Sequence, residues 1–146
     1  MSDWNDRVIA EFRENDGVTK GWGKSLVVMH TIGARSGEER LAPVMGRRDD
    51  AGGWYVVASK GGAPTHPAWY HNLVAHPSFD VEAHIDGRVQ TVRVTATELE
   101  GADYDAVWKL FVDRSPVFQQ YADKAGRKLP IFHLTPVVAA KRRIET

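Results

Sequence analysis

Apolar residues recur along the chain with two different periods. Trp4, Val8 and Phe12 are spaced four residues apart, which places them on one stripe of a helix that we predict over residues 3–14. Between positions 79 and 85, apolar residues alternate with Asp, Glu and His. This alternation predicts a half-buried strand with one face in water.

The same patterns predict further elements, separated by glycine-rich and proline-containing turns. Asp86-Gly87 predicts a two-residue hairpin, and Pro67 suits the first position of a helix. Strands outnumber the helices that could connect them, so we expect an α+β split β-barrel of about six mostly antiparallel strands with four helices. The further strands are expected at 26–32, 40–48, 53–59, 89–97 and 131–135, and the further helices at 67–75, 99–112 and 116–124.

The 146 residues are the length of one domain, so we expect a single domain over residues 1–146. A formal net charge of zero argues against a nucleic-acid partner, and the absence of cysteine excludes disulfides, thiolate catalysis and Cys-ligated metals. The first fifteen residues are charged throughout and do not resemble a signal peptide. These features predict a cytoplasmic protein.

Two sets of residues resemble known motifs but lack the spacing that those motifs require. Gly17 to Ser25 resembles a phosphate-binding Walker loop, but its glycine spacing is wrong and it leads into a strand. His66, His71 and His76 are spaced five residues apart, about 140° around a helix, so they do not share a face as metal ligands would. We therefore predict no metal site, and no catalytic triad is recognisable.

Two segments carry residues that can bind an anion. The turn Gly33 to Gly37 contains arginine and serine, although an ordinary hairpin turn with solvated arginines explains it equally well. Ser59 to Pro64 joins a strand to a helix N-terminus and supplies serine and lysine. In that helix, Trp69 could stack on a flat ring or belong to the core, and Asn72 offers an amide. Together the segments predict a site for a phosphorylated aromatic cofactor.

At these segments the chain resembles a known family. The run VVASKGGAPTHPAWYHNLVAHP (56–77) is similar to the signature of the deazaflavin-dependent nitroreductases, F420-binding reductases of actinobacteria with a split β-barrel fold. TIGARSGEERLAPV (31–44) and LPIFHLTP (129–136) resemble further segments of that family in the same order. The resemblance covers nearly the whole chain and implies coenzyme F420, an 8-hydroxy-5-deazaflavin, as the cofactor.

The resemblance also implies which residues form the site. Ala34 stands where the family has one cation of an Arg-Lys pair, and Phe118 stands where it often has a tyrosine. Tyr121 is the residue expected on the substrate side as a hydrogen-bond donor or proton source. The implied phosphate and tail contacts are Ala34, Arg35, Ser36, Arg40, Ser59 and Lys60, and the implied ring contacts are Pro43, Met45, Val57, Ala58, Ala68, Trp69, Asn72 and Phe118.

The implied reaction is hydride transfer from reduced F420 to a small electrophilic acceptor, such as a quinone, a nitroaromatic or an activated enone. Two alternatives stay open: a non-catalytic protein that binds F420 or an apolar ligand, and an FMN-dependent split-barrel oxidoreductase. A monomer is the expected state. The N-terminal helix is expected to pack on the barrel, with contact to the inner face of the cell membrane as the alternative.

Overall fold

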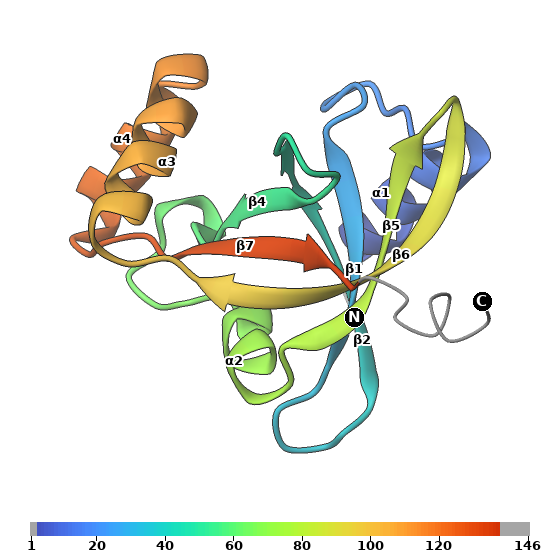
Figure 1. Cartoon of the computed structure of the whole chain (residues 1–146), viewed down its shortest axis with the longest axis horizontal. Helices are drawn as coiled ribbons and strands as arrows, with labels where there is room; N and C mark the ends of the chain where they lie inside the picture. The colour runs from blue at the N-terminus through green and yellow to red at the C-terminus, as the bar shows by residue number, and fades with distance from the viewer. Residues whose placement is uncertain (1–2, 138–146) are drawn as a thin grey trace, which may run out of the picture.

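The computed structural model describes residues 3–137, which form four α-helices, one short 3-10 helix and seven strands (Figure 1). The helices are α1 (Asp3–Glu14), η1 (Lys60–Gly62), α2 (Ala68–Ala75), α3 (Gly101–Arg114) and α4 (Val117–Ala125). The strands are β1 (Leu26–Ile32), β2 (Glu39–Met45), β3 (Arg47–Arg48), β4 (Trp54–Val57), β5 (Ser78–Ile85), β6 (Arg88–Glu98) and β7 (Ile131–Pro136).

The strands form a single antiparallel sheet in the order β2-β1-β5-β6-β7-β4-β3. Its two outermost strands, β2 and β3, are separated in the chain by Gly46 alone. The sheet must therefore curl until its two ends meet, and it forms the half-barrel visible in Figure 1. This confirms the expected α+β split-barrel fold.

Gly46 explains why the structure has seven strands where about six were predicted. A Cβ atom on Gly46 would lie 3.2 Å from side-chain atoms of both Trp54 and Val27, so a side chain here would require these neighbours to move. The predicted strand 40–48 is divided at this position, since β2 pairs with β1 and β3 pairs with β4. The pattern of apolar residues carries no signal for this break.

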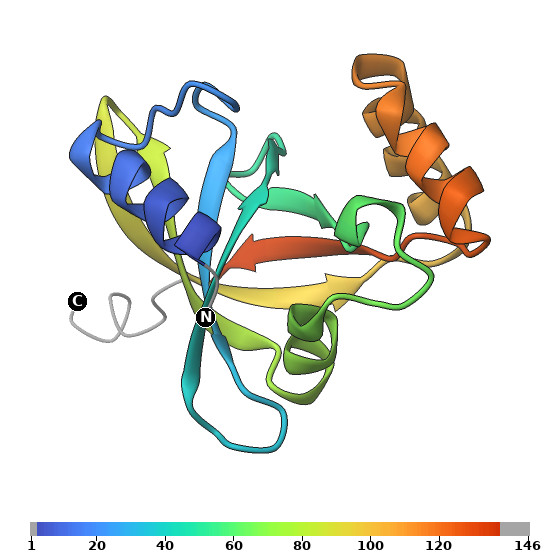
Figure 2. The same ribbon diagram turned by 180° about the vertical axis from the view of Figure 1, so that it is seen from behind.

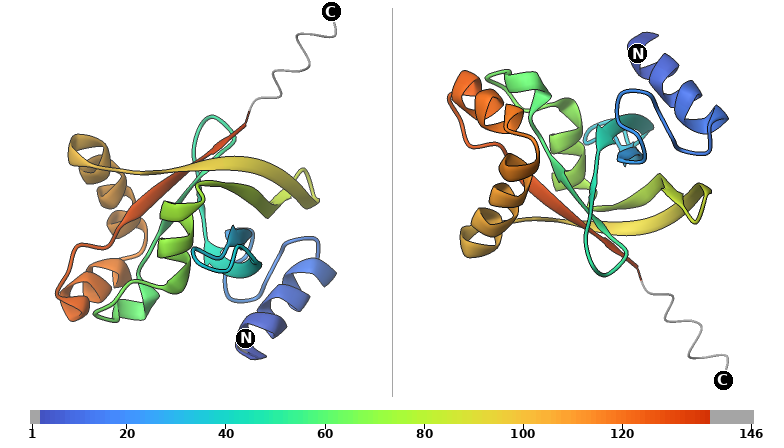
Figure 3. Two further views of the ribbon diagram at one scale, coloured as in Figure 1. Left: turned by 90° about the horizontal axis from the view of Figure 1, so that it is seen from below. Right: turned by 90° about the horizontal axis from the view of Figure 1, so that it is seen from above.

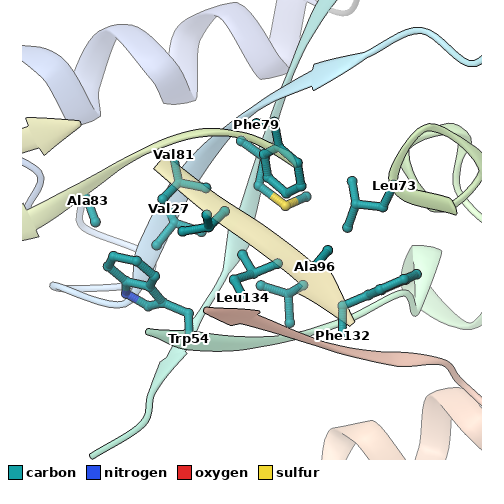
Figure 4. Packing of buried hydrophobic residues seen from close by; sticks show 12 residues of the cluster. Val27, Trp54, Leu73, Phe79, Val81, Ala83, Ala96, Phe132 and Leu134 are labelled. Carbon is teal, nitrogen blue, oxygen red and sulfur yellow. The ribbon is translucent and has the colours of Figure 1, made fainter. Parts of the chain in front are cut away.

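The main core lies inside the curl of the sheet. Trp54 and Leu134 face Val27, Val81 and residues of neighbouring strands (Figure 4). A second cluster joins α3 and α4 to one end of the sheet, and α1 lies at the other end (Figure 3). In α1, Val8 and Phe12 are buried against β1, as expected for a helix packed on the barrel, whereas Trp4, the third residue of the predicted stripe, is 48% exposed.

The expectation of a strand with one wet face was wrong at Glu82. Helix α1 lies across the outer face of β1 and β5 (Figure 2), and Glu82 is only 7% exposed. Its carboxylate accepts hydrogen bonds from Arg13 Nε and Nη2 at 3.0 and 2.6 Å, and its Oε2 lies 2.6 Å from His30 Nε2. The alternating pattern assigns Glu82 to the solvent face of the strand, but contact with Arg13 of α1 buries it.

Several local predictions hold with small shifts. Asp86 and Gly87 have φ values of 53° and 86°, as a two-residue hairpin with a primed turn requires. Pro67 precedes the first helical residue of α2 and is its N-cap, not the first position of the helix. The third strand ends at Val57, not at residue 59, because Ser59 caps η1. Helices α3 and α4 begin two and one residues later than predicted.

Candidate functional site

A cavity of about 600 Å³ lies over β2 and β4, between the two helical ends of the molecule. Trp4 and Trp22 line it from the α1 side, with ring centroids 5.8 Å apart in an edge-to-face arrangement. Its lining includes eight residues predicted from the sequence: Pro43, Met45, Val57, Ser59, Lys60, Trp69, Phe118 and Tyr121. Residues from β2, β4, α2 and α4 are therefore brought together at one place.

The fold explains how β2 can present its residues to this cavity. Pro43 has no N–H group to donate, which is tolerated because β2 is the first strand of the sheet and pairs with β1 on one side. Met45 pairs with Leu26 at the end of the strand, just before the break at Gly46. The end of β2 thus forms an apolar wall of the cavity.

Aromatic side chains of α2 and α4 form the opposite wall. Trp69 is half-buried, and its ring lies 6.2 Å from that of Phe132 while also lining the cavity, so it serves both the core and the site. Phe118 is buried, with rings of Phe111 and Tyr121 edge-on at 5.3 and 5.9 Å. These contacts hold Phe118 in one orientation.

Arg127 holds the loop that carries Ser59 and Lys60. Its guanidinium donates hydrogen bonds to the carbonyl oxygens of Ala63 at 3.2 Å and Thr65 at 2.9 Å, and longer ones to those of Ala58 and Ser59. Lys60 has a φ of 49°, a backbone conformation that needs such support from its surroundings. Sequence reasoning missed Arg127, because a single arginine between a helix and a strand has no distinguishing pattern.

His66 also contacts Arg127. Its Nδ1 lies 3.1 Å from Arg127 Nη1, which can only donate, so Nδ1 is the acceptor. Burial, together with the charge of Arg127 and the neighbouring His71, lowers the pKa of His66 below its ordinary value. His66 is therefore neutral at pH 7 and is part of the loop's scaffold.

Asn72 is engaged by the protein itself. Its side-chain Nδ2 donates to the Thr31 hydroxyl at 3.1 Å, and its Oδ1 accepts from the backbone N–H of Ala34 at 3.0 Å. The residue is 8% exposed and does not line the cavity. Its amide, expected to be offered to a ring carbonyl, joins α2 to the turn after β1.

The remaining predicted residues lie outside the lining of the cavity. Ala58 is completely buried, and Ala68 is exposed on α2. Arg40 is exposed and forms an ion pair with Glu38 at 3.3 Å. Ala34, Arg35 and Ser36 are exposed in the turn after β1. Of the three cations expected at the cavity, Arg35, Arg40 and Lys60, the structure has only Lys60 in its wall.

Residues 3–137 contain no group of three or more His, Asp or Glu side chains placed to hold a metal ion. In the same range, no helix has the length and apolar character needed to cross a membrane.

The family model of the F420H(2)-dependent quinone reductases matches residues 4–136. The chain belongs to this family. An F420H(2)-dependent quinone reductase of Mycobacterium tuberculosis is 32% identical over 111 residues, which cover 75% of this chain and 72% of that protein. The F420H(2)-dependent quinone reductase family is thus supported by both sequence comparisons, and it agrees with the resemblance stated above.

Solved structures agree with this assignment. An F420-H2 dependent reductase is 38% identical, with a TM-score of 0.65 over 76% of this chain and 94% of its own. A second structure, described as a domain-swapped dimer, is 36% identical, with a TM-score of 0.67 over 90% and 97% of the two chains. A heme storage protein from Vibrio cholerae, 15% identical with a TM-score of 0.60 over 90% and 89%, shares the fold alone.

As a member of the F420H(2)-dependent quinone reductase family, the protein is an oxidoreductase with coenzyme F420 as its cofactor. The cavity suits such a group. Its volume is within the range of cofactor sites, and Met45, Val57 and Trp69 give it apolar walls that fit a flat ring. Ser59 and Lys60 add a hydroxyl and an ammonium, which are donors for an anion.

Proposed function

We propose that the protein reduces a quinone, and that cofactor ring and quinone meet in the cavity over β2 and β4. The observation that carries the proposal is that eight predicted site residues, from β2, β4, η1 with its N-cap, α2 and α4, line this one cavity. A quinone is a flat, largely apolar molecule with two carbonyl oxygens, so it suits a cavity with aromatic walls and few polar groups. Nitroaromatics and activated enones share this shape and are further candidate acceptors.

Each group of residues has a distinct task in this proposal. Lys60 and Ser59 bind the cofactor's phosphate. Arg127 holds their loop in place by donating hydrogen bonds to its carbonyl oxygens. Trp69, Val57 and Met45 position the ring. Reduced F420, when bound, supplies a hydride. The protein then has to hold the two reactants at the right distance and exclude water, which is the role of the aromatic walls.

Tyr121 is the proposed donor to the acceptor. A quinone that receives a hydride develops negative charge on one carbonyl oxygen and then takes up a proton to become the hydroquinone. Tyr121 lines the cavity beside Phe118, so its hydroxyl can donate a hydrogen bond to that oxygen, and solvent can supply the proton. Phe118 contributes only its ring, since it lacks the hydroxyl expected from related sequences.

The proposal is tested by mixing the purified protein with reduced F420 and menadione. We expect the reduced cofactor to be oxidised in step with quinone reduction, and Tyr121→Phe to lower kcat by about a hundred- to a thousandfold, as loss of one donor to a developing oxyanion does. Nitroaromatic and enone acceptors are tested in the same assay. Binding of F420 without reduction of any of these acceptors would instead support a non-catalytic binding protein.

Two further measurements separate the remaining alternatives. An absorbance spectrum after incubation with F420 and gel filtration distinguishes bound deazaflavin from copurified FMN. Light scattering tests the monomer that we propose against a dimer, the state described for one structural relative. Both use the full chain.

A further inference from the structure

Helix α4 carries the proposed donor of the reaction and lies against the loop of the proposed phosphate contacts. Phe118 and Tyr121 are three residues apart on α4, and both line the cavity over β2 and β4. The same helix contacts η1, and the two elements lie side by side in Figure 2 and Figure 3. The position of Tyr121 in the cavity therefore depends on how closely α4 approaches η1.

Gly62, the last residue of η1, is buried and faces the backbone of α4. A Cβ atom on Gly62 would lie 3.2 Å from the Tyr121 carbonyl oxygen and 3.3 Å from the Tyr121 Cα. It would also lie 3.1 Å from Cδ of Lys124. The flexible Lys124 side chain can move aside, but the Tyr121 atoms are backbone atoms, so they move only with the helix. A side chain at this position would therefore displace Tyr121 by a few tenths of an ångström.

The turn that contains Gly62 is fixed by its own hydrogen bonds. The Gly62 N–H donates to the carbonyl oxygen of Ser59 at 3.0 Å, and the Ala63 N–H donates to that of Lys60 at 3.1 Å. Arg127 holds the Ala63 carbonyl oxygen from outside the turn. Gly62 itself has a φ of 87°, in the left-handed region that favours glycine. Because η1 is held in this way, α4 has to accommodate any atom added at Gly62.

A second contact of α4 is with α3. The ring of Phe118 is edge-on to that of Phe111 at 5.3 Å, and Phe111 is fully buried. The ring of Tyr121 is in turn edge-on to that of Phe118 at 5.9 Å. The place of the Tyr121 side chain in the cavity is thus defined by an aromatic contact with α3 and by the bare backbone of Gly62.

We propose that Gly62 is a positioning residue for the reaction: its close contact with α4 places the Tyr121 hydroxyl where it can donate to the acceptor's oxygen. This inference rests on the function proposed above. A donor has to be held within about 0.5 Å of its productive place, so a displacement of a few tenths of an ångström weakens its effect. The contact also joins the loop of Ser59 and Lys60 to the helix of Tyr121, so the cofactor contacts and the donor form one structural unit.

Two substitutions place a Cβ atom at this position. Gly62→Ala adds the Cβ alone, and Gly62→Asn adds it on a residue that adopts positive φ more readily than alanine. Gly87→Ala is the matched control, because Gly87 has a φ of 86° and a Cβ there would meet nothing within 4 Å in residues 3–137 beyond its chain neighbours. It introduces the same backbone strain without the contact. Thermal unfolding checks that each variant is folded, and Gly62→Asn carries the test if Gly62→Ala is not.

The position of Tyr121 is measured by fluorine NMR of the cofactor-free protein labelled with 3-fluorotyrosine. The chain has four tyrosines, and the signal that is missing from Tyr121→Phe belongs to Tyr121. We expect this signal to shift in both Gly62 variants and not in Gly87→Ala, because the ring current of the neighbouring Phe118 varies steeply with distance. A Tyr121 signal at its wild-type position in both Gly62 variants overturns the proposal.

The effect on the reaction is measured as kcat with saturating reduced F420 and menadione. A misplacement of 1 Å can cost roughly a hundredfold in rate, so we expect Gly62→Ala to lower kcat by about three- to tenfold, with a smaller change in the KM for menadione. In the Tyr121→Phe background the same substitution should leave kcat unchanged, because the hydroxyl on which Gly62 acts is absent. An equal loss of kcat in both backgrounds would show a general structural effect and overturn the proposal.

Failure of the proposed function gives a different result. A wild-type protein that binds reduced F420 but reduces none of the acceptors contradicts that function, whereas the NMR comparison needs neither cofactor nor acceptor. Wild-type kcat in Tyr121→Phe overturns both the donor role of Tyr121 and the positioning role of Gly62. Loss of kcat in Tyr121→Phe, with wild-type kcat in both Gly62 variants, overturns the positioning role alone.

Discussion

The side-chain amide of Asn72 on α2 donates a hydrogen bond to the hydroxyl of Thr31 on β1, at 3.1 Å. Thr31 is fully buried, and its hydroxyl in turn donates to the carbonyl oxygen of Arg40 on β2, at 2.7 Å. With the bond from the Ala34 N–H to Asn72, this chain of contacts joins α2 to both strands of the first hairpin. Asn72 therefore stabilises the frame around the cavity.

Replacing Asn72 with leucine should destabilise the fold. The change removes the donor to the buried Thr31 hydroxyl and the acceptor of the Ala34 N–H in the turn after β1. We expect the free energy of unfolding to fall by about 1–3 kcal/mol, measured by urea denaturation. Val74→Leu, at an exposed position on the same helix, is the control. A variant as stable as the wild type would show that the amide is not structural.

Replacing Arg127 with alanine should loosen the loop from Ala58 to His66. Four backbone carbonyl oxygens of that loop lose a charged donor, and Arg127→Lys cannot restore them because an ammonium lacks the planar fork of a guanidinium. Both variants should show faster amide hydrogen exchange in this loop and weaker binding of F420. Exchange at wild-type rates would mean that the loop holds its shape by itself.

Replacing Lys60 with alanine should weaken F420 binding. Its ammonium lies in the wall of the cavity and, apart from a 3.3 Å contact with Thr65 Oγ1, has no partner in residues 3–137. Loss of a charged hydrogen bond to phosphate predicts a change of about 1.5–3 kcal/mol in binding free energy. A fluorescence titration measures it, with Lys20→Ala as the control. Unchanged affinity would place the phosphate elsewhere.

Glu82 should make stability depend on pH in the acid range. Burial alone raises its pKa, but the hydrogen bonds from Arg13 and His30 outweigh burial, so the pKa lies below its ordinary value of 4.5. A carboxylate whose pKa is lower in the folded state stabilises that state above its unfolded pKa. This contribution disappears as the pH falls through the folded pKa.

Glu82→Gln tests this dependence. At pH 7 we expect the wild type to exceed the variant in free energy of unfolding by about 1–3 kcal/mol, since the neutral amide of the variant cannot accept the charged pair of bonds from Arg13. Urea denaturation at intervals from pH 7 to pH 3 should show the difference shrinking below about pH 4.5. A difference that stays constant over this range would contradict the assignment.

Local patterns were sufficient to predict most elements of this fold. The stripe of Val8 and Phe12, the alternation from 79 to 85 and the Asp86-Gly87 turn each depend on residues close in sequence, and each appears in the structure. The run from 56 to 77 likewise carries its family signature in consecutive residues, so the family and its cofactor could be named from the sequence. Eight of the residues that the same resemblance implied for the site line one cavity.

The tertiary structure decided what depends on contacts between distant segments. The curled sheet brings Trp54 and Val27 against Gly46, where the predicted strand is divided, and Glu82 is buried beside Arg13 of α1 and His30 of β1. Arg127 acts on a loop more than sixty residues away. Such contacts leave no periodic trace in the sequence, because each partner's position is set by the folding of the segments between them.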